Sequence, residues 1–99
     1  MKFFKKLSRS VKGRVAIITG AGSGMGEATA KVFASEGVKV LATDINLEGV
    51  KRVSEEIRSA KGECTPLLLD VTDKSAIDNC IEEALRIYDG IDFIINNAG

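Results

Sequence analysis

The sequence contains no histidine, no tryptophan, a single proline and only two cysteines among its 99 residues. The cysteines, Cys64 and Cys80, do not form a C-x-x-C pair. Because a zinc site needs several thiolate or imidazole ligands, the sequence predicts no metal site. We expect each thiol to be a small buried hydrophobe in a reducing compartment, which places the protein in the cytoplasm.

Net charge is also missing, but the zero sum hides an uneven distribution. Six of the fourteen basic side chains lie in residues 1–14, which carry no acidic side chain. The remaining residues therefore hold eight basic and fourteen acidic side chains. A nucleic-acid-binding domain carries its basic residues on the folded body, so we expect no nucleic acid partner.

Long apolar stretches are absent as well. None reaches the roughly 18–20 residues of a membrane-spanning helix, so no membrane span is expected. Residues 1–10 are basic but lack the continuous apolar core of a secretory signal. We interpret them as a solvated basic overhang. A short transit peptide is the alternative, because acids are absent and Ser8 and Ser10 are present.

Short apolar runs alternate with longer segments of helical periodicity. We expect strands at 15–19, 38–43, 67–69 (with Pro66 near its start) and 91–95. We expect helices at 25–35 and 47–60, and a third that is capped by Thr72 or Asp73 and ends near residue 88. The expected apolar faces are Met25, Ala28, Thr29, Val32 and Phe33; Leu47, Val50, Val53, Ile57 and Ala60; and Ile77, Cys80, Ile81, Ala84, Leu85 and Tyr88.

This alternation predicts β-α-β units with right-handed crossovers and a parallel sheet. The fold class is therefore α/β, a Rossmann-type doubly wound parallel sheet. Residues 11–99 would supply its first four strands, in the spatial order 3-2-1-4, as an incomplete N-terminal part of the domain.

Four of the ten glycines lie in residues 20–26, between the first strand and the first helix. A turn without Cβ atoms lets the backbone approach a pyrophosphate, and the helix N-terminus presents N–H donors to it. A merely flexible turn would need only one or two glycines. Glu27 and Ala28 follow Gly26 where a P-loop has Lys-Ser/Thr, and the G-x-G-x-x-G spacing is also absent.

The pattern Thr19-Gly20-x-x-x-Gly24-x-Gly26 resembles the first β-α turn of the short-chain dehydrogenase/reductase family. Three further matches follow in order: Asp44 after the second strand, Asp70-Val71 after the third, and Asn96-Asn97-Ala98-Gly99 after the fourth. The resemblance covers residues 11–99. It implies the NAD-binding portion of an oxidoreductase that acts on an alcohol/ketone pair.

The resemblance implies that the cofactor is held by Gly20, Gly22, Ser23, Gly24, Met25, Gly26, Asp44, Asp70, Val71 and Asn97. A carboxylate at Asp44 accepts hydrogen bonds from ribose hydroxyls and repels a 2′-phosphate. Neither Ser23 nor Ile45 is basic, so we expect NAD rather than NADP. Asp44 as a plain turn residue and Asp70 as a helix-introducing residue are the alternatives, and Asn96 is expected to brace the sheet.

The family's catalytic serine and Tyr-x-x-x-Lys pair are not found in this sequence. Tyr88 is its one tyrosine, and no lysine lies within residues 86–92. We therefore predict no catalytic residue here. We interpret the chain as part of a longer, homo-oligomeric protein that binds an alcohol or ketone substrate. One alternative is a non-enzymatic nucleotide-binding module. The other is an S-adenosylmethionine methyltransferase, because residues 20–24 also match the G-x-G-x-G turn of those enzymes.

Overall fold

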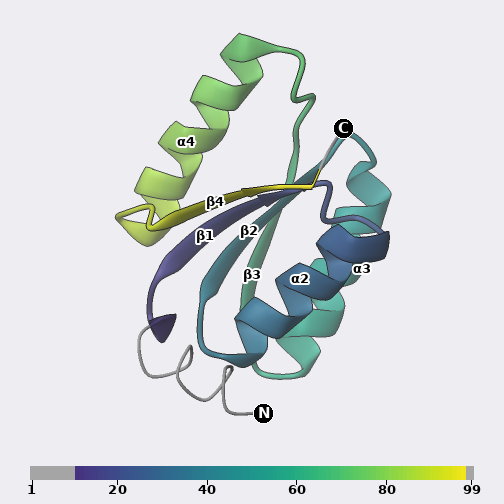
Figure 1. The fold of residues 1–99 in the computed structure, drawn as a ribbon, viewed down its shortest axis with the longest axis vertical. Coiled ribbons are helices and arrows are strands. Elements are labelled where there is room, and N and C mark those ends of the chain that lie inside the picture. The colour runs from purple at the N-terminus through teal and green to yellow at the C-terminus, as the bar shows by residue number, and fades with distance from the viewer. Residues whose placement is uncertain (1–10, 98–99) are drawn as a thin grey trace.

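The computed structural model describes residues 11–97 as a four-stranded parallel sheet with helices on both faces (Figure 1). In chain order the elements are β1 (Val15–Thr19), α2 (Gly24–Ser35), β2 (Lys39–Asp44), α3 (Leu47–Ser59), β3 (Glu63–Leu68), α4 (Lys74–Tyr88) and β4 (Phe93–Asn96). The strands lie in the order β3-β2-β1-β4, which confirms the predicted order. The basic overhang, residues 1–10, and the end of the Asn-Asn-Ala-Gly motif, residues 98–99, lie outside the described residues.

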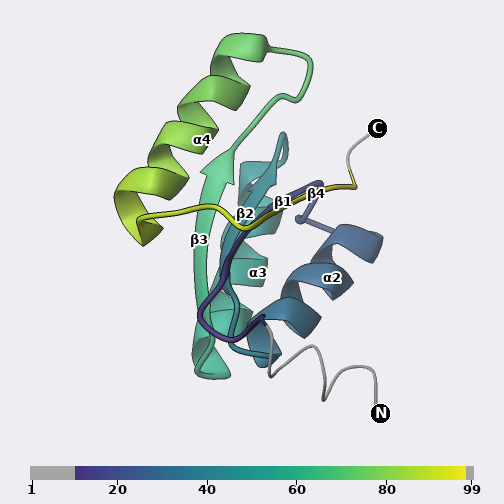
Figure 2. The same cartoon turned by 60° about the vertical axis from the view of Figure 1, so that its left-hand side comes forward.

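The sheet separates two apolar cores. Helices α2 and α3 lie side by side on one face, and α4 covers the other (Figure 2). All five residues of β1 are buried because both of its faces are covered. Ala16 and Ile18 belong to the core beneath α2 and α3, whereas Ile17 belongs to the core beneath α4. The continuous apolar run at 15–19 therefore marks a central strand, as predicted.

The third strand differs from its prediction. It begins at Glu63 and ends at Leu68, so Pro66 lies inside the strand and is paired in register with Ala42 of β2. A proline is tolerated there because β3 is an edge strand, whose outer side needs no N–H donor. Residues 63–66 carry no apolar run, which is why the hydrophobic pattern placed the strand too late.

Each of the three predicted helix faces also needs correction. Helix α2 buries Gly26, Ala30 and Ala34, while Met25 is 78% exposed. These small side chains let the helix lie close to the sheet, so the buried stripe is not the most apolar one. The stripe of α3 is confirmed except for Ala60, which caps the helix and is exposed. On α4, Leu85 is 49% exposed because the sheet covers only part of a wide apolar stripe.

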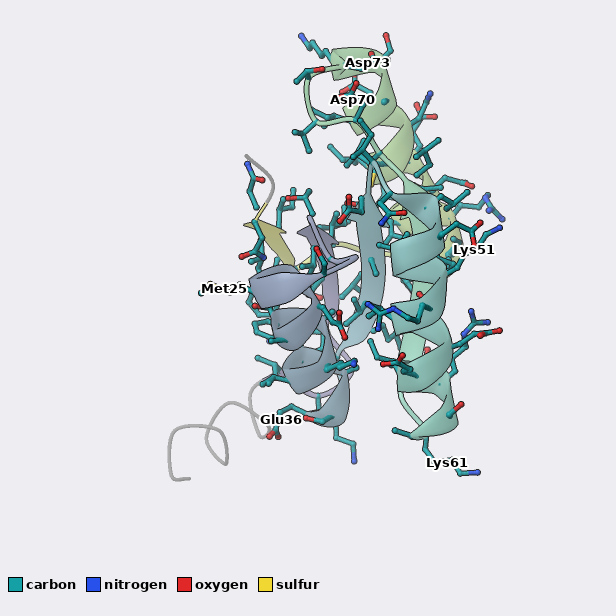
Figure 3. The ribbon with its side chains drawn as sticks, turned by 90° about the vertical axis from the view of Figure 1, so that its right-hand side faces the viewer. Met25, Glu36, Lys51, Lys61, Asp70 and Asp73 are labelled. Atoms are coloured by element: carbon teal, nitrogen blue, oxygen red, sulfur yellow. The ribbon has the colours of Figure 1, made fainter. Side chains whose placement is uncertain are left out.

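The segments that follow the four strands lie at the carboxyl edge of the sheet, where a doubly wound fold binds its ligands. Figure 3 shows Met25 at the start of α2, and Glu36 and Lys61 at the opposite ends of α2 and α3. Asp70 and Asp73 lie together on the connection between β3 and α4 (Figure 3). None of the helices in residues 11–97 is long and apolar enough to cross a membrane.

Candidate functional site

The start of α2 keeps an open approach to its backbone. Its N-cap, Ser23, makes no capping hydrogen bond through its side chain, whereas Asn46 and Asp73 cap α3 and α4 with side-chain oxygens. Gly24 has a φ of 59°, and a Cβ built on it would meet nothing within 4 Å. The first turn of α2 therefore offers N–H groups beside open space, which is the arrangement that binds an anion.

Gly26 sets how closely α2 approaches the turn. A Cβ on Gly26 would lie 1.9 Å from the carbonyl oxygen of Gly20, so no side chain fits between the helix and the end of β1. The last glycine of the motif is therefore required by packing, and it brings the helix N-terminus against the turn. This is a cradle of backbone, as a pyrophosphate requires.

Asp44 lies against the same turn. Its Oδ2 accepts a hydrogen bond from the backbone N–H of Gly22 at 2.9 Å, and its Oδ1 accepts one from the N–H of Asn46 at 3.0 Å. The Asn46 contact is that of a strand-end turn residue, and the Gly22 contact joins the carboxylate to the glycine turn. Each carboxylate oxygen keeps a further acceptor site for a ligand hydroxyl.

Asp70 and Val71 follow β3. Within residues 11–97, neither makes a hydrogen bond or ion pair with residues 20–26. Asp70 Oδ1 instead accepts hydrogen bonds from the side-chain hydroxyl and the backbone N–H of Thr72, which lower the pKa of Asp70. Asp73 caps α4, so Asp70 is not the helix cap. Val71 is half-buried against the core beneath α4.

The end of β4 is tied to β1 through one hydroxyl. Thr19 Oγ1 donates to Asn96 Oδ1 at 2.7 Å and accepts a hydrogen bond from the backbone N–H of Asn97 at 3.1 Å. Asn96 therefore braces the sheet, the role expected for it. Asn97 is exposed, and its backbone is fixed next to the point where the glycine turn begins.

Tyr88 belongs to the core and not to this site. Its hydroxyl lies 2.7 Å from Thr65 Oγ1 and donates to the carbonyl of Val40 at 3.2 Å. Burial raises the pKa of Tyr88, the opposite of what an acid/base tyrosine needs. Burial also raises the pKa of the two free cysteine thiols, Cys64 and Cys80. Residues 11–97 hold no group of three or more side chains that could bind a metal ion.

One residue at the turn was missed by the sequence analysis. Arg52, on α3, donates through Nη2 to the carbonyl oxygen of Gly22 at 3.2 Å. Its only signal in the sequence is the spacing of four residues to Glu56, which indicates an ion pair on a helix surface and nothing about a turn 30 residues away.

Comparison with known proteins agrees with this geometry. Residues 14–99 match the model of the family described as short chain dehydrogenase. A 3-oxoacyl-[acyl-carrier-protein] reductase of Thermotoga maritima is 40% identical over 89 residues, covering 90% of this chain and 36% of the reductase. A 2,5-dichloro-2,5-cyclohexadiene-1,4-diol dehydrogenase of Sphingobium indicum is 43% identical over 93 residues, covering 94% of this chain and 37% of the dehydrogenase.

A solved structure shows the same arrangement of elements. The crystal structure of a hydroxysteroid dehydrogenase from Escherichia coli superposes with a TM-score of 0.88 at 34% sequence identity. The match covers 90% of this chain and 38% of that protein. The chain thus spans well under half of the length of each of these three proteins.

Proposed function

The chain belongs to the short-chain dehydrogenase family, whose members bind a nicotinamide dinucleotide, and we propose on that premise that it binds NAD in preference to NADP. The observation that carries the proposal is the hydrogen bond between Gly22 and Asp44. It places a carboxylate beside the turn whose open backbone would receive the pyrophosphate.

The turn would hold the pyrophosphate. The N–H groups at the start of α2 would donate to its oxygens, and the positive end of the helix dipole would offset its charge. Gly20 and Gly22 keep the backbone free of side chains, and the exposed Ser23 and Met25 flank the approach. The space beside Gly24 and the close packing at Gly26 fit a group of this size and charge.

Asp44 would select the cofactor. Its oxygens would accept hydrogen bonds from the adenosine ribose hydroxyls, while a 2′-phosphate in their place would meet a like charge. Neither Ser23 nor Ile45 supplies a cation that would offset this repulsion. Asp70 and Val71 would lie at the adenine, and Asn97 near the adenosine ribose.

Catalysis would require residues beyond those named here. When the cofactor is bound, its nicotinamide ring accepts or releases hydride. The described residues of this chain would bind and orient the adenosine half, and Tyr88, the one tyrosine, is engaged in the core. We place residues 11–99 as the N-terminal part of a longer, homo-oligomeric oxidoreductase that acts on an alcohol/ketone pair.

A ligand titration tests the proposal. The chain, labelled with ¹⁵N, would be titrated separately with NAD, ADP-ribose and S-adenosylmethionine, and amide shifts followed. We expect NAD and ADP-ribose to shift the amides of residues 20–26 with comparable, weak affinities, because the nicotinamide adds few contacts. Shifts at these residues with S-adenosylmethionine alone would instead favour a methyltransferase.

A further inference from the structure

We propose that Arg52 is a positioning residue for the glycine turn: it fixes the Gly22 backbone from α3 and thereby strengthens cofactor binding without contacting the cofactor. The proposal rests on the proposed function for its effect on binding. Its effect on the turn itself can be measured without any ligand.

Both backbone polar groups of Gly22 are held by side chains from different elements. Asp44, at the end of β2, accepts from its N–H at 2.9 Å, and Arg52, on α3, donates to its carbonyl at 3.2 Å. A glycine loses more conformational freedom on ordering than any other residue, so such a turn gains most from being fixed before a ligand arrives.

Helix α3 also packs directly on the same carbonyl. A Cβ on Gly49 would lie 2.8 Å from the Gly22 oxygen and 3.2 Å from its Cα. Gly49 and Arg52 are three residues apart and share one side of the helix. The first turn of α3 therefore packs against Gly22, and the Arg52 guanidinium adds a hydrogen bond to the same carbonyl.

Arg52 is itself held in place by two carboxylates. Its Nη2 lies 2.8 Å from Glu27 Oε1, and its Nη1 lies 3.1 Å from Glu56 Oε2. Lys31 pairs with the same two carboxylates, at 2.7 Å from Glu27 Oε2 and 2.6 Å from Glu56 Oε1. These four charges join α2 to α3 directly behind the glycine turn.

The planar guanidinium is what allows one side chain to serve these partners together. Arginine offers five N–H donors in a rigid fork, so Arg52 reaches Glu27, Glu56 and the Gly22 carbonyl at once. A lysine ammonium is a single point on a flexible stem and would hold one or two of these acceptors. The positioning role is thus specific to arginine at this position.

The experiment compares Arg52→Met with Arg58→Met. Arg58 is an exposed arginine of the same helix that donates a hydrogen bond to the backbone carbonyl of Ser54 and not to the turn, so it is a matched control. Two quantities are measured for each chain: the hydrogen-exchange rate of the Gly22 amide without ligand, and the Kd for ADP-ribose. Arg52→Lys and Glu56→Gln complete the set.

For Arg52→Met we expect the Gly22 amide to exchange about three to ten times faster and the Kd to rise by a similar factor, as for loss of one ordinary hydrogen bond. Arg58→Met and Glu56→Gln should stay within about twofold of the wild type, because both keep the Gly22 contact. Arg52→Lys should fall between wild type and Arg52→Met, and it decides the question if Arg52→Met does not fold.

Equal exchange rates and equal Kd values for the Arg52 and Arg58 variants would overturn the positioning role and leave the proposed function intact. A wild-type chain that does not bind ADP-ribose would overturn the proposed function instead, while the ligand-free exchange comparison would still decide whether Arg52 fixes the turn.

Discussion

The carboxylate of Asp44 and the backbone N–H of Gly22 form a 2.9 Å hydrogen bond across 22 positions of sequence. The neighbouring backbone supports this contact, since the N–H of Ala21 donates to the carbonyl of Thr43 at 2.9 Å. The end of β2 and the glycine turn after β1 therefore form one unit. A ligand that uses the turn would meet the Asp44 carboxylate beside it.

Replacing Asp44 with alanine should weaken NAD binding by about 1–3 kcal/mol, as for lost hydrogen bonds to a charged acceptor. Binding of NADP should improve relative to NAD, because the repulsion of its 2′-phosphate is removed. Calorimetric titration of both cofactors measures the ratio. Asp78→Ala, which removes an exposed carboxylate from α4, is the control and should leave the ratio unchanged.

Gly24, in the glycine turn, and Gly13, outside it, make a matched pair for testing whether the turn binds the cofactor. Both have a left-handed φ, 59° and 82°, and a Cβ on either would meet nothing within 4 Å. Alanine at each position should therefore cost about 1–2 kcal/mol of folding stability, measured by urea unfolding. Only Gly24→Ala should also weaken dinucleotide binding. Equal binding by the two variants would place the pyrophosphate elsewhere.

Thr19→Val removes the hydroxyl that joins β1 to β4 at Asn96 and Asn97. Because Thr19 is a buried residue, we expect a loss of about 1–3 kcal/mol and faster hydrogen exchange in β4. Thr43→Val, the control, removes a buried hydroxyl that donates to the carbonyl of Ile18. It should destabilise the chain without a selective increase of hydrogen exchange in β4. Unchanged β4 exchange in Thr19→Val would argue against the brace.

Regular patterns made most of this fold predictable. The apolar run at 15–19 predicted the buried strand β1. The alternation of strands and helices, together with the right-handed crossover rule, predicted the strand order. The errors occur where local pattern is overruled by position in the sheet. Pro66 is tolerated because β3 is an edge strand, and α2 buries Ala30 and Ala34 where it lies close to the sheet.

The site was predicted less completely than the fold. Asp44 was expected at the cofactor from its position after the second strand and from the family resemblance, but its bond to Gly22 depends on side-chain geometry. The contact of Arg52 with Gly22 depends on how α3 packs against the turn, which no sequence period encodes. Long-range contacts of single polar side chains are therefore what the sequence alone leaves undetermined.

Low pH should weaken the ion pairs that join α2 to α3, which are formed by Glu27, Lys31, Arg52 and Glu56. Hydrogen bonds from Arg52, then Lys31, lower the pKa of Glu27 from its ordinary value of 4.5 to about 2. The folded state therefore binds this proton less readily than the unfolded state, so the stabilisation is present above pH 4.5 and is lost as the pH falls toward 2.

Glu27→Gln should accordingly lower the Tm at pH 7 and flatten its decline between pH 4.5 and 2. Glu82→Gln, an exposed position on α4, is the control and should keep the wild-type pH profile. Thermal unfolding followed by circular dichroism measures both. A Glu27→Gln profile parallel to that of the wild type would show that this carboxylate does not contribute through its ionised form.

The most direct measurement is a parallel titration of the unmodified chain with NAD and NADP, followed through the amides of residues 20–26 and Asp44. NAD should shift these amides and bind at least about tenfold more tightly than NADP, the equivalent of one unfavourable charge contact of about 1.4 kcal/mol. Equal or tighter binding of NADP would contradict the role of Asp44. A failure of both cofactors to shift the turn would contradict the site itself.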